Sequence, residues 1–413
     1  MKPALRMFAL WWLPGLLMLL AGMMALLRTG RVDPRDWTAA SLILIAAALA
    51  IARRGGLAPL LWAGMGAVGT VLLFAWIAAD RPPEPYASAW LAATAGLAMA
   101  GGELLARRSW WFGSAFCAGA MLLCWLADRP QLGPSGLSRP RLAVISGLPL
   151  FWREGAEGAA ARVDAPVIAL LRQHFAVTPV DSPLSPDLTQ AQALLLAHPR
   201  LLSPAELVAI DAWVRGGGTA VVLADPMLRW PLALPLGDRR RPPAISLLSP
   251  LLTHWGLQLM PPQSMDEDRH FLDDGTLLTI FAASRFRTES ATCRLAADGL
   301  LARCRIGRGR ALLLADADLI DDRLWLTDPA TPLDRRNWTA DTPDFIARAL
   351  QGVVSEPGHW LRSEARLLVG LRWAMLFGIF WAAMGSALLR WPLIGISAVS
   401  FRSLRPRERR ESA

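Results

Sequence analysis

Polar side chains follow the predicted strands in the middle of the sequence, each at the point where an apolar run ends. The runs 142–145, 193–197, 219–224 and 311–315 are short and bounded by polar residues, glycine or proline, which is typical of buried strands. In a doubly wound α/β sheet, ligands bind in the crevice at the carboxyl ends of the strands. The sequence therefore predicts a candidate ligand-binding pocket formed by the residues that follow these runs: Ser146, Gly147, His198, Asp225, Asp316 and Asp318. The alternative is that the acidic residues cap helices or accept hydrogen bonds from turn amides.

Two kinds of chemistry are open to these residue types. A histidine with two carboxylates, here His198, Asp225 and Asp316, can supply the acid and the base of a hydrolase if the side chains lie within hydrogen-bond reach of one another. Carboxylate oxygens also suit hard cations such as Ca²⁺ or Mg²⁺, and four aspartates lie within residues 316–322. That run has neither EF-hand spacing nor a glycine pivot, and no Cys/His cluster favours zinc. The sequence alone predicts no metal site and no cofactor.

Two of the four cysteines flank a predicted hairpin. Asp298-Gly299 is a strong turn signal, and with these two residues as the loop Cys293 lies opposite Cys304. We expect a hydrogen-bonded pair with Cα atoms about 5.5 Å apart, which is within the range of a disulfide. A disulfide would place the hairpin in an oxidising compartment. The alternative is two half-buried thiols on one face of the hairpin, while Cys117 and Cys124 lie in an apolar segment and are predicted to pack there.

Helix signals alternate with these strands. Asp164 and Pro166 begin a predicted helix that ends at Phe175, and Pro343 lies in the first turn of the last helix of this region. Ser203 and Glu206 form a predicted capping box for a further helix, which stops at three consecutive glycines. The alternation of strands and helices predicts a parallel, doubly wound α/β sheet, with antiparallel strands added in its second half.

Six apolar segments of about membrane-spanning length surround this region. Five precede it and one follows it: Phe8–Leu27, Trp37–Ala52, Leu57–Ala79, Tyr86–Ala106, Trp110–Ala127 and Leu371–Leu389. The predicted fold class is therefore an α-helical membrane bundle with an inserted α/β domain. The predicted division is 1–129 for the five-span bundle, 140–358 for the soluble domain, 367–390 for the sixth membrane helix and 391–413 for a basic tail.

The basic residues between these segments predict the orientation of the chain. Lys2, Arg53–Arg54, Arg107–Arg108 and the arginine-rich tail share one side, which the positive-inside rule assigns to the cytoplasm. The loop 28–36, with three arginines, opposes this assignment. We expect a multi-pass protein of the bacterial inner membrane with both termini cytoplasmic, residues 140–358 periplasmic and the first apolar run retained as an anchor.

The net charge of +9 comes largely from the basic residues at the ends of the apolar segments and from the tail, positions that suit contact with lipid headgroups. The lipid bilayer is therefore the expected partner of the basic residues, and no nucleic-acid partner is predicted. The spans carry almost no ionisable groups apart from Glu103, which disfavours a channel or a transporter acting alone.

The order of elements in the middle region resembles the GldG-type domain of gliding-motility and ABC-transport auxiliary proteins. The resemblance covers about residues 140–356 and is carried by these segments: Leu194–Ala197, Ser203–Gly218, Val221–Pro226, Gly307–Asp318, Asn337 and Pro343–Leu350. It implies a flavodoxin-like fold similar to class I glutamine amidotransferases. The five N-terminal spans depart from the single anchor on each side that is common in that family.

The resemblance also makes a chemical comparison possible. Amidotransferases need a cysteine nucleophile on a sharp strand-to-helix turn, but His198-Pro199 and Asp225-Pro226 occupy the corresponding positions. We therefore expect a non-enzymatic membrane protein whose soluble domain binds a partner protein or small ligand for a transport or envelope-assembly complex. A separate ATPase or transporter subunit is the candidate partner, since no segment predicts nucleotide binding. The alternative is a membrane-anchored hydrolase that uses the acids and the histidine at the ends of the strands.

Overall fold

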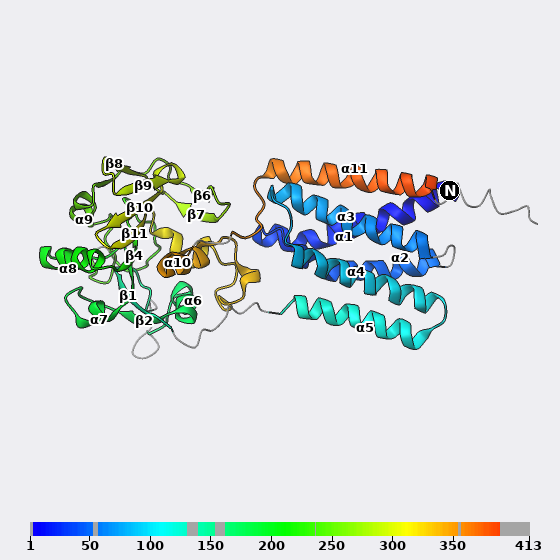
Figure 1. The fold of residues 1–413 in the computed structure, drawn as a ribbon, viewed down its shortest axis with the longest axis horizontal. Coiled ribbons are helices and arrows are strands. Elements are labelled where there is room, and N and C mark those ends of the chain that lie inside the picture. Colours follow the sequence, from blue (N-terminus) through cyan, green and yellow to red (C-terminus); the bar gives the residue numbers. More distant parts are fainter. Residues whose placement is uncertain are drawn as a thin grey trace, which may run out of the picture. The chain divides into compact units, whose positions relative to one another are not determined.

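The computed structural model describes residues 3–52, 57–129, 139–152, 162–235, 237–353 and 357–388 (Figure 1). The chain divides into two compact units. The first comprises Met1–Leu27, Val32–Arg129 and Leu361–Ala413, and the second comprises Arg28–Arg31 and Pro130–Trp360. The predicted basic tail 391–413 and the dipeptide Arg53–Arg54 lie outside the described residues.

The first unit is a bundle of apolar helices, and six of its segments are long and apolar enough to cross a membrane. Its helices are α1 (Pro3–Thr29), α2 (Ile43–Ala52), α3 (Leu57–Ala79), α4 (Pro85–Ala106), α5 (Trp110–Ala127) and α11 (Glu364–Leu388). The second candidate span, Pro34–Ala52, begins with two 3₁₀ turns, η1 (Pro34–Trp37) and η2 (Ala39–Leu42), and continues into α2. The side chain of Asp33 accepts a hydrogen bond from the Arg35 amide and so begins the first of these turns.

The C-terminal helix α11 packs against α3, and the two lie side by side in Figure 1. The indole nitrogen of Trp62 donates to the carbonyl of Trp381 at 3.0 Å, and Trp381 donates to the carbonyl of Trp62 at 2.8 Å. The two rings stack with centroids 4.3 Å apart. Position 66 requires glycine, since a Cβ at Gly66 would come within 2.4 Å of the Trp381 ring. This joins the last membrane segment to a helix about 300 residues earlier in the chain.

The second unit is built around a mixed seven-stranded sheet in the order β2-β1-β3-β4-β11-β10-β9. Its strands are β1 (Arg141–Ser146), β2 (Ala176–Pro179), β3 (Ala193–Ala197), β4 (Thr219–Leu223), β9 (Cys293–Ala296), β10 (Leu301–Ile306) and β11 (Gly309–Leu314). The first four and β11 pair in parallel, and β10 and β9 extend the sheet antiparallel. Strand β3 is buried along its whole length, as the apolar runs predicted for the centre of the sheet.

Helices and two small antiparallel sheets complete this unit. The helices are α6 (Pro166–His174), α7 (Pro186–Gln190), α8 (Pro204–Arg215), α9 (Ser249–His254) and α10 (Thr342–Gln351). The small sheets pair β5 (Leu257–Leu259) with β8 (Phe286–Thr288), and β6 (Glu267–Phe271) with β7 (Leu277–Phe281). The predicted capping box is present at α8, where Ser203 accepts from the Glu206 amide while Glu206 accepts from the Ser203 amide.

The predicted disulfide between Cys293 and Cys304 is present, and the two residues are partners in the β9–β10 register. The predicted hydrogen-bonded pair is wrong. The amide of Arg305 donates to the carbonyl of Thr292 at 2.9 Å, so the adjacent cysteine pair is the non-hydrogen-bonded one, where the backbones approach more closely. The Cα–Cα distance is 4.0 Å instead of about 5.5 Å. The turn is also longer than predicted, because the strand pairing stops at Ala296 and Leu301.

Candidate functional site

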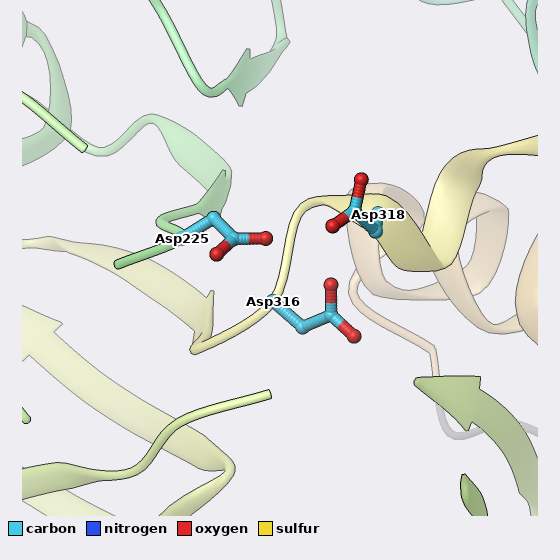
Figure 2. A group of neighbouring side chains, drawn as sticks. All are labelled: Asp225, Asp316 and Asp318. Carbon is cyan, nitrogen blue, oxygen red and sulfur yellow. The ribbon is translucent and has the colours of Figure 1, made fainter. Parts of the chain in front are cut away.

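Three aspartates meet at the carboxyl ends of β4 and β11, two neighbouring parallel strands. Asp225 lies two residues after β4, Asp316 lies two residues after β11, and Asp318 begins the 3₁₀ turn η5 (Asp318–Ile320). One carboxylate oxygen of each residue lies within 4.8 Å of the others. Figure 2 shows the three carboxylates turned toward one another. Parallel pairing brings the ends of adjacent strands to one edge of the sheet, and this places residues 91 positions apart in one cluster.

Backbone amides orient these carboxylates. Asp225 accepts from the amide of Met227 at 2.7 Å through Oδ1 and from the amide of Ala317 at 3.0 Å through Oδ2, so it joins the two loops. Asp316 accepts from Phe281 at 2.9 Å through Oδ2 and from Leu319 at 3.2 Å through Oδ1.

Asp318 differs from the other two because only one of its oxygens is used in this way. Its Oδ2 accepts from the amide of Arg229 at 2.7 Å. Its Oδ1 is buried and has no hydrogen-bond partner among the described residues. Burying a carboxylate oxygen without a partner costs free energy, and a bound ligand or a proton on this oxygen would remove that cost.

Burial and mutual repulsion dominate the electrostatics of the cluster. The exposed fractions of Asp225, Asp316 and Asp318 are 0%, 0% and 1%. Burial raises the pKa of all three, and the charge of Asp225 raises the pKa of the other two further. The pKa of Asp318 is raised to about 7. Within the part of the chain that the structure describes, no lysine or arginine side chain forms an ion pair with these carboxylates.

His198 follows β3, the other neighbour of β4, and is fully buried. Its Nε2 lies 2.9 Å from the carbonyl of Pro243, which can only accept, so Nε2 carries a proton. Burial lowers the pKa of His198, and the Pro243 bond and the charge of Asp225 oppose this shift. Its φ of 44° is left-handed, a conformation that histidine adopts more often than most residues. The site therefore places the His198 ring close enough to Asp225 for the Asp225 charge to influence its protonation.

Ser146 and Gly147 support the His198 turn. The Ser146 hydroxyl donates to the carbonyl of Ala197 at 2.9 Å and accepts from the amide of Leu148 at 3.0 Å. The amide of Gly147 donates to the carbonyl of His198 at 3.2 Å, and a Cβ at Gly147 would lie 2.8 Å from that oxygen. The structure thus brings Asp225, Asp316 and Asp318 together and places His198 beside Asp225. It places Ser146 and Gly147 against the backbone of residues 197–198.

Sequence reasoning did not identify the partners of these residues. The five amides that orient the carboxylates belong to loops, to the turn η5 and to β7. Any residue type except proline can supply a backbone amide, so the sequence does not identify these donors. Asp321, which belongs to the acidic run, accepts hydrogen bonds from Arg323 and begins the turn η6 (Asp322–Leu324) instead of joining the cluster. The proximity of Asp225 and Asp316 follows from the pairing of β4 with β11, which the sequence analysis did not predict.

Two cavities of the second unit lie elsewhere. One, of about 240 Å³, is lined by residues at the amino ends of β4 and β11, including Thr219, Arg310 and Phe345. The other, of about 500 Å³, lies beside the β9–β10 turn and includes Arg285 and Asp298. None of the three aspartates lines either cavity.

Residues 139–272 match a protein-family model, ABC_transp_aux, described as an ABC-type uncharacterized transport system. The predicted GldG-type, ABC-transport auxiliary domain is thereby confirmed over residues 139–272. The later segments of the resemblance, from Gly307 to Leu350, lie outside the match. None of the curated proteins matches this chain.

Several solved structures are similar at low identity. An exo-β-1,4-mannosidase from Opitutaceae bacterium strain TAV5 is 14% identical with a TM-score of 0.29, over 58% of this chain and 38% of that one. A β-galactosidase from Bacillus circulans sp. alkalophilus is 13% identical with a TM-score of 0.28, over 51% of this chain and 33% of that one. A cytoplasmic protein from Salmonella typhimurium LT2 is 10% identical with a TM-score of 0.32, over 52% of this chain and 99% of that one. The chain therefore spans about a third of the length of the two glycosidases.

Proposed function

We propose that this chain is an integral membrane auxiliary of an ABC-type transport or envelope-assembly complex, in which the α/β unit binds a partner protein or small ligand. The observation that carries the proposal is the transport-auxiliary match at residues 139–272, in a chain with six candidate membrane helices. The spans and the family match both support work at a membrane together with other subunits. A separate ATPase or transporter subunit would supply the energy.

The strand order supports a flavodoxin-like description of the α/β unit. Its parallel strands run β2-β1-β3-β4-β11, which corresponds to the 2-1-3-4-5 order of flavodoxin-like sheets. In such sheets ligands bind beyond the carboxyl ends of the strands. The Asp225, Asp316 and Asp318 cluster occupies that edge, so we expect the loops that carry it to form the binding region.

The burial of the cluster disfavours hydrolysis at these residues. A hydrolase substrate must reach the acid and the base, yet Asp225, Asp316 and His198 each have an exposed fraction of 0%. The disulfide also occupies both cysteines of the α/β unit, Cys293 and Cys304, and so removes the thiols that an amidotransferase mechanism would use.

The apolar loop 148–152, which follows β1, offers little surface for docking. Its residues Leu148 and Leu150 have exposed fractions of 4% and 0% and belong to the core of the unit. They pack because Leu150 accepts from the amide of Ala165 before α6, which folds the loop onto the sheet. A partner would therefore contact other loops of the unit.

We place the protein in the bacterial inner membrane, with both termini in the cytoplasm and residues 140–358 in the periplasm. The basic pair Arg107–Arg108 between α4 and α5 supports a cytoplasmic loop at that point. The Cys293–Cys304 disulfide supports an oxidising compartment for the α/β unit.

Affinity capture from gently solubilised membranes tests the proposed function. Tagged full-length protein is compared with a variant that lacks residues 140–358 but keeps all six candidate spans. We expect a transporter subunit or an ATPase to copurify with the full chain and to be lost with the deletion. Equal recovery of the same proteins by both forms would contradict a partner role for the α/β unit. Hydrolase activity that disappears in the variant His198→Asn would favour the enzymatic alternative.

A further inference from the structure

We propose that Asp225, Asp316 and Asp318 bind one hard divalent cation of the Ca²⁺ or Mg²⁺ class. The inference goes beyond the proposed function, since cation binding is a property of this chain alone and needs no partner. Three carboxylates from two adjacent loops are the oxygen ligands that such ions prefer.

The spacing of the oxygens fits a single ion. One oxygen from each carboxylate lies within 4.8 Å of the other two. Ca²⁺ binds its ligands at about 2.3–2.6 Å, so two oxygens on opposite sides of the ion lie up to about 5 Å apart. The ion is also small enough to fit between three side chains that are closed to a larger ligand.

The charge of the site also favours a cation. Three carboxylates lie in the interior without an ion-pair partner among the described residues, and like charges at this separation repel one another strongly. A divalent ion would neutralise two of the three charges. The neighbouring Asp321 does not need such an ion, since it is paired with Arg323.

A second observation points to a ligand at the same place. Asp318 is 99% buried, by its exposed fraction of 1%, and its Oδ1 has no hydrogen-bond partner in the described structure. The carboxylate is turned toward Asp225 and Asp316 in Figure 2. The remaining oxygens each accept one backbone amide, which fixes the carboxylates in place and leaves a second lone pair of each oxygen available.

The test measures Mn²⁺ binding to the full chain in detergent micelles, after removal of metal with EDTA. The signal of free Mn²⁺ in electron paramagnetic resonance reports the bound fraction, and Ca²⁺ and Mg²⁺ are then added as competitors. We expect one saturable site per chain with a Kd below about 1 mM, and displacement by at least one of the two competitors. No saturable binding in this range would overturn the proposal and would mean that protons alone neutralise the cluster.

Two variants separate coordination from general negative charge. Asp318→Asn keeps an oxygen for the Arg229 amide but removes the ligand charge, so we expect Mn²⁺ affinity to fall roughly tenfold or more. Asp321→Asn removes a nearby buried charge outside the cluster, and we expect it to bind Mn²⁺ as the unsubstituted chain does. Equal losses in the two variants would overturn the site.

A thermal measurement keeps the proposal testable if Asp318→Asn folds poorly. Ca²⁺ or Mg²⁺ at saturating concentration should raise the Tm of the unsubstituted chain, because a ligand bound only to the folded state stabilises it. The same ion should not raise the Tm of Asp225→Asn or Asp316→Asn. A Tm increase that survives in both variants would place the ion elsewhere in the chain and contradict the proposal.

Discussion

Asp341 joins three segments of the α/β unit through one buried side chain. Its Oδ2 accepts from the amide of Leu277 at 2.9 Å, and its own amide donates back to the Leu277 carbonyl at 2.8 Å. Its Oδ1 accepts from the amide of Gly358 at 3.1 Å, and Asp341 also precedes the first residue of α10. Burial is the main cause that raises the pKa of Asp341 to about 6, against a value of 3.8 for an ordinary aspartate.

This pKa predicts a pH dependence of stability. The folded state holds the Asp341 proton more tightly than the unfolded state, so the stabilisation is complete below about pH 4 and is lost as the pH rises through 6. The stability of the unsubstituted chain relative to Asp341→Asn should therefore fall by about 2 kcal/mol between pH 4 and 7. Thermal unfolding of both forms in detergent between pH 4 and 7 measures this difference. Parallel pH curves for the two forms would contradict the raised pKa of Asp341. The variant Asp298→Asn, at an exposed aspartate, serves as the control and should show the same pH dependence as the unsubstituted chain.

The cluster of three aspartates shows which part of a site is open to sequence reasoning. Residue types and the ends of apolar runs identified Asp225, Asp316 and Asp318 as candidates, because a buried strand that ends in an acid is visible in one sequence. Their proximity depends on the β4–β11 pairing, which joins strands 85 or more residues apart and is not encoded in either run. The orphaned Asp318 oxygen depends on the path of η5, and no residue pattern specifies it.

At the scale of elements, the α8 capping box offers a direct test of local stabilisation. The Ser203 side chain satisfies the amide of Glu206, which has no partner within the helix. Ser203→Ala should destabilise the chain by about 1 kcal/mol, as is usual for the loss of an N-cap. Thermal unfolding measures the loss, with Val208→Ala, an exposed position of the same helix, as a control that should change stability little. A smaller loss for Ser203→Ala than for the control would contradict the role of the cap.

The β9–β10 hairpin provides a chemical test at the same scale. The chain has four cysteines, two of them joined as Cys293–Cys304 and two free. Alkylation in denaturant should therefore modify two cysteines before reduction and four after it, as counted by mass spectrometry. The double variant Cys293→Ser, Cys304→Ser should lose about 2–3 kcal/mol, since the disulfide closes a short loop in the unfolded chain. Four modified cysteines before reduction would show that the bond does not form in the cell.

Elements with a strong local signal were predicted well, and elements that depend on distant contacts were not. The capping box and the apolar runs at β3 and β4 act within a few residues, so the sequence specifies them. The small β6–β7 sheet was not predicted, because β6 is largely exposed and its residues Glu267–Phe271 lack an apolar run. The cysteine register was correct while its hydrogen-bond class was wrong, since the turn took two more residues than the Asp-Gly signal requires.

At the scale of the whole molecule, the side of the membrane on which the α/β unit lies depends on the number of spans before it. Five spans place it opposite the N-terminus, and four would place it on the same side. The deciding segment is Pro34–Ala52, which has only ten residues of α-helix after its 3₁₀ turns. At about 2 Å per 3₁₀ residue and 1.5 Å per α-helical residue, its 19 residues extend about 30 Å if they are coaxial, enough to cross the hydrocarbon core.

Cysteine labelling in intact cells decides between the two counts. In a chain with Cys117→Ser and Cys124→Ser, a single cysteine is introduced at Val208, which is 67% exposed on α8, or at Ala413. With five spans before the α/β unit, we expect a membrane-impermeant maleimide to label Val208→Cys in intact spheroplasts. It should label Ala413→Cys only after the membrane is opened, because the sixth span returns the chain to the cytoplasm. The reverse pattern would mean that Pro34–Ala52 does not cross the membrane or that the N-terminus lies outside. It would contradict the proposed periplasmic placement of the α/β unit, and a partner would then have to be sought on the cytoplasmic side.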